Sequence, residues 1–380
     1  MKNENKELEF IILLIIIIGI IIVPILYFIP SSISVSSSSF DKRVCAFYYT
    51  WYANQTSYYG ENDGEADIIS HWGESHPELD PPIVHDPESD PWDIAAENHP
   101  TVGTDNLVLY DSADPDAIRF HLDLAEYAGI DTFIATWWGQ GNRMDNNFEQ
   151  LLNITEMYDY PMQQTIYFET MQDKYSYENP NVVQNLYNDL TYVIDNYGNH
   201  SKFLKIYDKD LKLERPVIFV YSAVFKPSVE NWESVIVMLH KNNYYPFLIA
   251  DMAFKSINEE IFDIFDGFHM YNPLGVYRDE PDRALQRIET LVLASRVHND
   301  LACATVLPGY NDTQVRHGVG SLERKNGETY KYTWEVAIQS NPDWILICSF
   351  NEWHEGTEIE PSYEHNTFYI NKTKEYISMF

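Results

Sequence analysis

Basic side chains are scarce in this sequence. Its 380 residues carry 25 Lys and Arg against 58 Asp and Glu, which gives a formal net charge of −33 at pH 7. A field of this sign repels the phosphate backbone of nucleic acids and the surface of anionic lipids. We therefore expect no nucleic-acid partner. A neutral polymer such as a polysaccharide suits the charge better, although a surface adapted to solubility would carry the same excess.

Cysteine is also rare. Cys45, Cys303 and Cys348 all lie in apolar runs, and none belongs to a Cys-x-x-Cys pair. An odd number of such residues is typical of small core side chains, not of a disulfide framework or a zinc site. The sequence shows no convincing metal cluster and no cofactor motif, so we expect neither a metal nor a cofactor.

Apolar residues, in contrast, are plentiful. The chain is 45% hydrophobic and 15% aromatic, which is ample for a sizeable core and excludes a disordered protein. The length suits one large domain or two small ones. Nothing in the sequence indicates an oligomeric state.

The N-terminus has the pattern of a membrane anchor. After a short flank, residues 1–9, an apolar stretch at residues 10–29 is long enough to cross a bilayer. A Ser-rich stalk follows at residues 30–43. A cleaved signal peptide would have a shorter apolar region and a small-residue cleavage site, so we favour an uncleaved transmembrane signal anchor.

Two features favour a position outside the cytosol for the part of the chain that follows the apolar stretch. The flank before the apolar stretch is too short to hold a domain. The remaining chain carries five N-x-Ser/Thr sequons, which are acceptors for N-glycosylation in secreted proteins: Asn54, Asn153, Asn199, Asn311 and Asn371. We therefore expect a single-pass membrane glycoprotein with a lumenal or extracellular domain.

Short apolar runs alternate with helical patterns beyond residue 43. Eight runs read as strands covered on both faces: Val44–Tyr52, Thr132–Trp138, Gln164–Thr170, Val217–Tyr221, Phe247–Asp251, Gly267–Tyr271, Ala302–Leu307 and Trp344–Phe350. The helical patterns are Pro115–Gly129, Asn147–Tyr158, Asn181–Tyr197, Ser228–Lys241, Asn258–Phe265, Pro281–Val297 and Glu328–Ser340.

Eight strands with intervening helices or loops predict an α/β protein, a (β/α)8 TIM barrel over residues 44–380 with long βα loops. An open doubly wound sheet is the alternative, but it would normally use fewer strands and a phosphate-binding glycine turn, which we do not find. The long segment Ala53–Asp105 is expected to overhang the C-terminal face of the barrel, where barrel active sites lie.

Aromatic and polar side chains gather at the predicted C-terminal ends of the strands. In chain order these are Tyr48, Tyr49, Trp51, Trp137, Trp138, Glu169, Tyr271, Tyr310, Arg316, Asn351, Glu352, Trp353, His354 and Glu355. Taken singly, each is as well explained by core packing or an ion pair. In a barrel the strand ends share one rim, so together they predict a cleft suited to a sugar.

The last strand end offers two carboxylates beside aromatic rings. Glycosidic bond cleavage needs one carboxyl to protonate the leaving oxygen and another to assist attack at the anomeric carbon. Glu352 and Glu355 suit these tasks, and flat rings pack on sugar faces. A solvated acidic loop would show the same spacing, but the aromatic context favours catalysis.

Five segments make the sequence resemble glycoside hydrolase family 99, the endo-α-1,2-mannosidases and endo-α-1,2-mannanases. They are Phe47–Tyr52, Tyr197–His200, Phe265–Phe268, Pro308–Thr313 and Ser349–Thr357. The last one is long and specific, and the resemblance spans roughly residues 44–360. It implies a (β/α)8 barrel that cleaves internal α-1,2-mannosidic linkages with retention.

The resemblance also implies a role for each glutamate. The family's counterpart of Glu352 takes the proton from the substrate's own 2-hydroxyl, which closes onto C1 as a 1,2-anhydro sugar. The counterpart of Glu355 protonates the leaving oxygen and then activates water. This scheme needs Glu352 ionised and Glu355 protonated. A carboxylate nucleophile remains the alternative and needs carboxyl groups about 5–5.5 Å apart.

The third strand departs from the family pattern. Where the family typically has His-x-Glu-Pro-Tyr, this chain reads Tyr167-Phe-Glu169-Thr-Met171. The Glu is kept while its neighbours change, so the sequence does not decide between mannan and a glucose-capped N-glycan as substrate. Two readings without hydrolysis stay open: a glycan-binding barrel, and a barrel associated with glycan biosynthesis.

Overall fold

The computed structural model describes residues 40–54, 71–104, 106–252, 259–318 and 320–380. The predicted flank and membrane anchor, and the stalk up to residue 39, lie outside these residues. None of the helices within the described ranges is long and apolar enough to cross a membrane.

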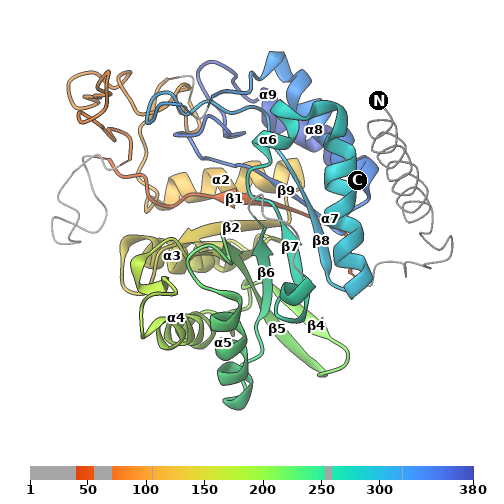
Figure 1. Ribbon diagram of the computed structural model, residues 1–380. Coiled ribbons are helices and arrows are strands. Elements are labelled where there is room, and N and C mark those ends of the chain that lie inside the picture. The colour runs from red at the N-terminus through yellow and green to blue at the C-terminus, as the bar shows by residue number, and fades with distance from the viewer. Residues whose placement is uncertain (1–39, 55–70, 105, 253–258, 319) are drawn as a thin grey trace, which may run out of the picture. The chain divides into compact units, whose positions relative to one another are not determined.

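Eight parallel strands form the centre of the fold. They are β1 (Arg43–Tyr48), β2 (Thr132–Trp137), β3 (Gln163–Glu169), β5 (Leu213–Tyr221), β6 (Phe247–Asp251), β7 (Gly267–His269), β8 (Leu301–Val306) and β9 (Trp344–Ile347). The order runs β3-β2-β1-β9-β8-β7-β6-β5, and an additional pairing of β3 with β5 closes the sheet. The predicted (β/α)8 barrel is thus confirmed (Figure 1).

One strand was not predicted. β4 (Lys205–Asp208) pairs antiparallel with β5 and lies outside the closed barrel. Its sequence, Lys-Ile-Tyr-Asp, mixes charged and apolar residues, and none of them is buried, so it lacks the continuous apolar pattern of a covered strand. The hairpin exists because β5 extends beyond the barrel toward its own N-terminus and offers a pairing edge.

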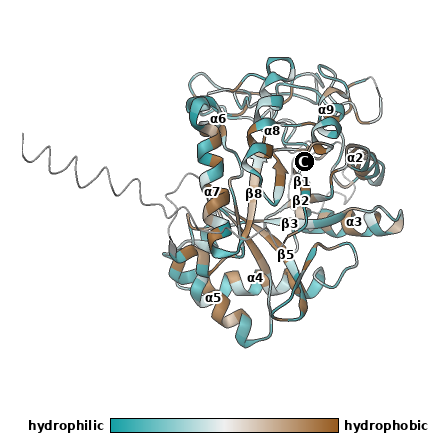
Figure 2. Ribbon diagram, turned by 90° about the vertical axis from the view of Figure 1, so that its right-hand side faces the viewer, coloured by the Kyte–Doolittle hydropathy of each residue, from teal (hydrophilic) through white to brown (hydrophobic). Residues whose placement is uncertain are grey.

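Helices surround the strands. They are α2 (Pro115–Ala128), α3 (Arg143–Met157), α4 (Val182–Asn196), α5 (Val229–Lys241), α6 (Leu274–Asp279), α7 (Ala284–His298), α8 (Glu328–Ser340) and α9 (Phe368–Ile377). In Figure 2 strands β5 and β8 are coloured as hydrophobic, whereas the helices around them mix both colours. This is the pattern of helices that bury one face against a sheet.

The ends of α2 show how the sequence sets these boundaries. The Asp114 side chain accepts a hydrogen bond from the amide of Asp116, and Pro115 occupies the first turn, where its missing N–H costs nothing. At the other end Gly129 takes a left-handed conformation with φ 86°, which glycine adopts without strain.

Several predicted boundaries were wrong. The first strand ends at Tyr48 and the last at Ile347, because the residues beyond them leave the ladder to form the turns of the C-terminal face. The predicted helix at 258–265 is a short 3-10 turn, η2 (Glu259–Asp263), within the described residues. Helices α6 and α9 were not predicted.

Alternation along the strands separates two aromatic layers. Phe47 points into the barrel, where its ring lies 4.8 Å from that of Tyr167 and 5.6 Å from that of His269. Tyr48, the next residue, stacks on Phe133 at 4.5 Å in the layer between the strands and α2. Neighbouring aromatic residues of one strand therefore serve opposite faces.

Candidate active site

The segment after β9 is held by backbone hydrogen bonds. The Glu352 amide donates to Oγ of Ser349 (2.7 Å), and the Ser349 amide donates to the carbonyl of Thr357 (2.9 Å). On the side facing the β8 loop, the Asn311 amide donates to the carbonyl of Glu355 (2.7 Å). Both glutamates therefore sit on a fixed turn at the C-terminal end of the barrel.

This turn requires a glycine at position 356. Gly356 has φ +59°, and a Cβ atom there would lie 3.0 Å from the carbonyl oxygen and 3.1 Å from the amide nitrogen of Asn311. The left-handed conformation and the close approach both disfavour a side chain. The residue thus lets the β8 loop approach the catalytic segment.

Glu352 is the more buried of the two carboxyl groups. Only 3% of the residue is exposed, and its Oε2 atom has no hydrogen-bond partner within the described residues. Burial and the nearby Glu355 raise the pKa of Glu352 well above its usual value, while the Arg316 guanidinium acts in the opposite direction.

Glu355 has polar partners. The Tyr271 hydroxyl donates to its Oε2 atom (3.2 Å), and Nη2 of Arg316 lies 3.8 Å from its Oε1 atom. Burial raises the pKa of Glu355, and Arg316 and Tyr271 oppose that rise. Its side chain keeps 15% of its surface accessible, so a ligand at the C-terminal face of the barrel can reach it.

Burial raises the pKa of both carboxyl groups, and Glu352 lacks the Tyr271 hydrogen bond that opposes this rise at Glu355. The sequence-based expectation was that Glu352 is ionised and Glu355 protonated. The two carboxyl environments differ, and the division of the proton between them stays a prediction.

Three predicted aromatic residues lie beside the pair. The Tyr49 hydroxyl donates to that of Tyr271 (2.5 Å), which in turn donates to Glu355. The ring of Trp51 packs 4.7 Å from the ring of Tyr49 and is partly exposed. These residues form an aromatic wall that leads from the surface toward Glu355.

Glu169 lies across the site on β3. Thr136 Oγ1 donates to Glu169 Oε1 (3.1 Å), and Thr136 itself accepts a hydrogen bond from Nε1 of Trp138 (3.2 Å). Burial, with Asp251 and Glu355 adding negative charge, raises the pKa of Glu169 to about 8. A carboxyl group of this kind is neutral at pH 7 and can donate a hydrogen bond.

Tyr310 and Arg316 are joined by Asp312. The Tyr310 hydroxyl donates to Asp312 Oδ2 (2.8 Å), and Nε of Arg316 lies 3.0 Å from the same oxygen. Asp312 thus orients the guanidinium toward Glu355 while half of the Arg316 side chain stays exposed.

Two predicted sugar-binding residues face away from the cleft. The Tyr48 hydroxyl contacts Nδ1 of His121 on α2 (2.9 Å). Trp137 donates from Nε1 to Asp145 on α3 (2.8 Å) and is fully buried. Both side chains lie between the strands and the helices, so they pack the barrel wall and offer no face to a ligand.

Asn351 and Trp353 belong to the turn that carries the two glutamates, and their side chains are buried. The Asn351 side chain accepts from the amide of Tyr49 (2.7 Å) and donates to its carbonyl (2.9 Å). Trp353 is fully buried and donates from Nε1 to Glu360 (3.2 Å). These residues position the turn and the aromatic wall, and their buried side chains do not contact the cleft.

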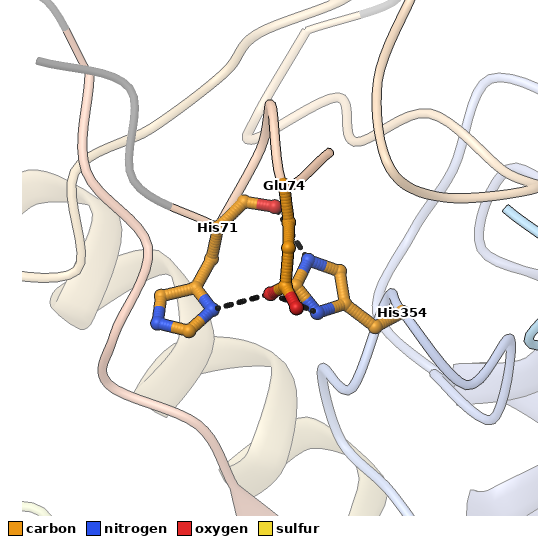
Figure 3. Close-up of side chains that lie close together, drawn as sticks. All are labelled: His71, Glu74 and His354. Atoms are coloured by element: carbon orange, nitrogen blue, oxygen red, sulfur yellow. Dashed lines mark hydrogen bonds and ion pairs between the residues drawn. The ribbon is translucent and has the colours of Figure 1, made fainter. Parts of the chain in front are cut away.

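His354 belongs to a cluster that the sequence did not indicate. His71 and Glu74, from the loop after β1, lie beside it, and potential ligand atoms of the three side chains are all within 4.8 Å of one another (Figure 3). Such a group could hold a metal ion, whereas the sequence showed no convincing metal cluster. No short sequence motif predicts this cluster, because His354 is 283 residues from His71.

A second buried pair was also missed. His121 Nε2 lies 3.0 Å from Oε1 of Glu360, and both side chains are inaccessible. The two residues are 239 positions apart, so only the folded chain brings them together. They anchor the segment after the catalytic turn to α2.

Known proteins resemble this chain over most of its length. A profile of glycosyl hydrolase family 99 matches residues 39–376. The glycoprotein endo-α-1,2-mannosidase of Mus musculus is 28% identical over 349 residues, covering 86% of this chain and 70% of the mouse protein. That of Xenopus laevis is 27% identical over 338 residues, covering 84% and 70%.

The fold has a counterpart among solved structures. The family 99 endo-α-mannosidase of Bacteroides thetaiotaomicron superposes with a TM-score of 0.72 at 23% identity, covering 90% of this chain and 98% of that one. The family profile spans more than half of the chain, and the barrel places the two glutamates where barrel enzymes carry their active sites. The chain therefore belongs to glycosyl hydrolase family 99 and is a glycoside hydrolase.

Proposed function

We propose that this chain is an endo-acting, retaining hydrolase of α-1,2-linked mannose glycans. The observation that carries the proposal is the pair Glu352 and Glu355 on one rigid turn, with Tyr271 and Arg316 at the second carboxyl. The names of the relatives, endo-α-1,2-mannosidases from several vertebrates, support the linkage and the internal mode of cleavage.

The reaction proceeds in two steps, after which each carboxyl group has regained its initial protonation state. Glu352 takes the proton of the substrate's 2-hydroxyl, O2 attacks C1, and the bond from C1 to the leaving oxygen breaks as Glu355 protonates that oxygen. The product of this step is a 1,2-anhydro sugar. Glu355 then takes a proton from water, the water oxygen opens the ring at C1, and Glu352 returns its proton to O2. Two inversions at C1 give net retention.

The surroundings fit the division of roles. Glu352 is enclosed, and its Oε2 atom has no hydrogen-bond partner within the described residues, so this carboxyl group keeps an acceptor for a sugar hydroxyl. Glu355 is more accessible and can exchange the leaving sugar for water. The aromatic wall formed by Tyr49, Trp51 and Tyr271 offers an apolar surface for sugar rings.

Product analysis on defined linkages tests the proposal. Purified full-length protein in detergent is incubated with an α-1,2-linked manno-oligosaccharide and, as a linkage control, an α-1,6-linked one. We expect internal cleavage of the first substrate alone, with α-configured product in early NMR spectra. Glu352→Gln and Glu355→Gln should each lower kcat/KM by at least about 10²-fold, as expected for loss of acid–base catalysis.

A matched carboxylate variant provides the control. Glu364 follows the catalytic turn in the sequence, and its Oε1 atom lies 2.6 Å from Nδ1 of His99. Because this ion pair does not involve Glu352 or Glu355, Glu364→Gln should leave kcat/KM unchanged. Initial product in the β configuration would refute retention. Cleavage confined to chain ends would refute the endo mode.

We also propose that residues 10–29 anchor the protein in a membrane with the barrel on the lumenal or extracellular side. The apolar length supports the anchor, and three of the sequon residues, Asn153, Asn199 and Asn371, are exposed on the barrel, as glycosylation requires. Protease protection of the barrel in sealed microsomes, together with a mass shift on deglycosylation, would support this orientation. Digestion from the cytosolic side would refute it.

A further inference from the structure

Three side chains that can ligate a metal converge at the catalytic turn. His71 and Glu74 belong to the loop after β1, whereas His354 follows the catalytic Glu352 by two positions (Figure 3). Their exposed side-chain fractions are 29%, 36% and 7%. The cluster is thus open to solvent at the loop and closed at the barrel.

The distances match the edges of a metal coordination shell. Oε2 of Glu74 lies 3.4 Å from Nδ1 of His71 and 3.5 Å from Nδ1 of His354. Ligands at about 2.0–2.1 Å from a tetrahedral zinc ion are about 3.3–3.4 Å from one another. The remaining distance, between the two imidazole nitrogens, is within 4.8 Å, so a modest rotation of the rings completes the shell.

The hydrogen bonding of His354 fixes its tautomer. Its Nε2 atom contacts the backbone carbonyl of His71, and a carbonyl can only accept, so Nε2 carries the proton. In the neutral ring Nδ1 then presents a lone pair toward a carboxylate oxygen of Glu74. A proton or a metal ion between Nδ1 and this oxygen would satisfy both atoms, and the second case is the one the cluster of three ligands favours. An imidazole that donates its other N–H to a carbonyl is the usual arrangement of a metal-ligating histidine.

The side chains of His71 and Glu74 are also oriented by their neighbours. Nδ1 of His71 is buried and lacks a hydrogen-bond partner within the described residues, and its ring stacks on Trp51 at 4.6 Å. Oε1 of Glu74 contacts Nε2 of His76 (3.1 Å), which turns Oε2 toward the two imidazoles.

We propose that His71, Glu74 and His354 form a binding site for a divalent transition-metal ion of the zinc class. Two imidazole nitrogens and one carboxylate oxygen favour zinc, cobalt or nickel over calcium and magnesium, which prefer oxygen ligands. A bound ion would join the loop after β1 to the turn that carries the glutamate pair. It would hold that loop in place at the edge of the cleft.

Metal content and spectroscopy test the site without reference to activity, so the result is separate from that of the proposed reaction. Full-length protein in detergent is stripped with EDTA, dialysed, and titrated with zinc by calorimetry, with bound zinc measured by mass spectrometry. We expect one zinc ion per chain and a rise in Tm on zinc addition. With cobalt in place of zinc, we expect the intense visible absorption of a four-coordinate ion.

Variants locate the ion. His71→Gln and Glu74→Gln should each weaken zinc binding by at least about 10-fold and abolish the rise in Tm. His200→Gln is the matched control, because His200 also faces a carboxylate, Glu156 at 3.6 Å, but belongs to no group of three potential ligands in the described part of the chain. It should bind zinc as the wild type does.

Two results would overturn the proposal. The first is no retained zinc and no cobalt absorption in the wild-type protein. The second is zinc bound equally well by His71→Gln and Glu74→Gln, which would mean an adventitious ion only, held by others of the 12 histidines. If either variant fails to fold, the cobalt spectrum of the wild type and the remaining variant still decide the question.

Discussion

Replacing Glu169 by Gln should make the protein more stable at alkaline pH. Burial raises the pKa of Glu169 from 4.5 to about 8. In the unfolded chain the group loses its proton near pH 4.5, whereas in the native state it keeps the proton up to about pH 8. Between these values the native state binds more protons, so the free energy of unfolding falls as the pH rises.

The size of the effect follows from the two pKa values. Each unit of difference is worth about 1.4 kcal/mol, so the shift of Glu169 corresponds to about 5 kcal/mol between pH 4.5 and 8. Glutamine resembles the protonated acid in shape and has no proton to lose. Glu169→Gln should therefore match the wild type in stability near pH 4.5 and exceed it by up to about 5 kcal/mol at pH 8.

Urea unfolding at half-unit steps from pH 4.5 to 8.5 measures this difference. The control is the variant Glu289→Gln. Glu289 is an exposed carboxylate on α7, so the free energy of unfolding of this variant should follow that of the wild type at every pH. If the Glu169→Gln and wild-type curves run parallel across the range, Glu169 is ionised in the native state. The assignment of a neutral hydrogen-bond donor on β3 would then be wrong.

Three further substitutions separate the structural residues from those at the cleft. Tyr48→Phe removes the contact with His121 (2.9 Å) and should lower the free energy of unfolding by about 1–2 kcal/mol in urea titrations, with kcat/KM unchanged; a large loss of activity would contradict the outward placement of the ring. Asn351→Ala leaves the amide and carbonyl of Tyr49 unpaired and should lower the free energy of unfolding by about 2–4 kcal/mol. No change in this free energy would show that other groups replace the two hydrogen bonds. Gly356→Ala forces a side chain into φ +59°, which costs about 1–2 kcal/mol, and should lower kcat by at least about 10-fold as the glutamates shift; normal kinetics would show that the turn can relax.

The barrel was predictable because its strands are covered on both sides. A run such as Phe247–Asp251, which forms β6 as predicted, reads as a strand from its apolar residues alone. β4 escaped prediction because its stability comes from pairing with β5 and not from burial. Strand ends were overestimated for a related reason: the turns after β1 and β9 are as apolar as the strands.

The sequence grouped aromatic residues of the candidate site that the structure separates, for a geometric reason. The run from Tyr48 to Trp51 looked like one aromatic platform, yet a strand sends successive side chains to opposite faces. Tyr48 consequently packs against α2, while Tyr49 reaches Tyr271. Applying strand alternation up to the last residue of β1 would have separated these two roles.

Contacts between distant parts of the chain could not be predicted. The cluster of His71, Glu74 and His354 depends on where the loop after β1 crosses the turn after β9. The buried pair of His121 and Glu360 likewise joins a helix near the start of the barrel to a segment near its end. Local patterns in a single sequence do not predict contacts between residues that are far apart in the chain.

The pairing of β1 with β9 has a consequence for biosynthesis. Cys45 lies opposite Leu346 in this ladder, so one edge of the first strand stays open until nearly the whole chain has been made. During translation the nascent protein must therefore carry an incomplete sheet with unpaired edges, which is a form prone to aggregation. Ribosome-bound chains that stop before β9 should need chaperones, and release of the last strand from the ribosome should be the event that seals the barrel.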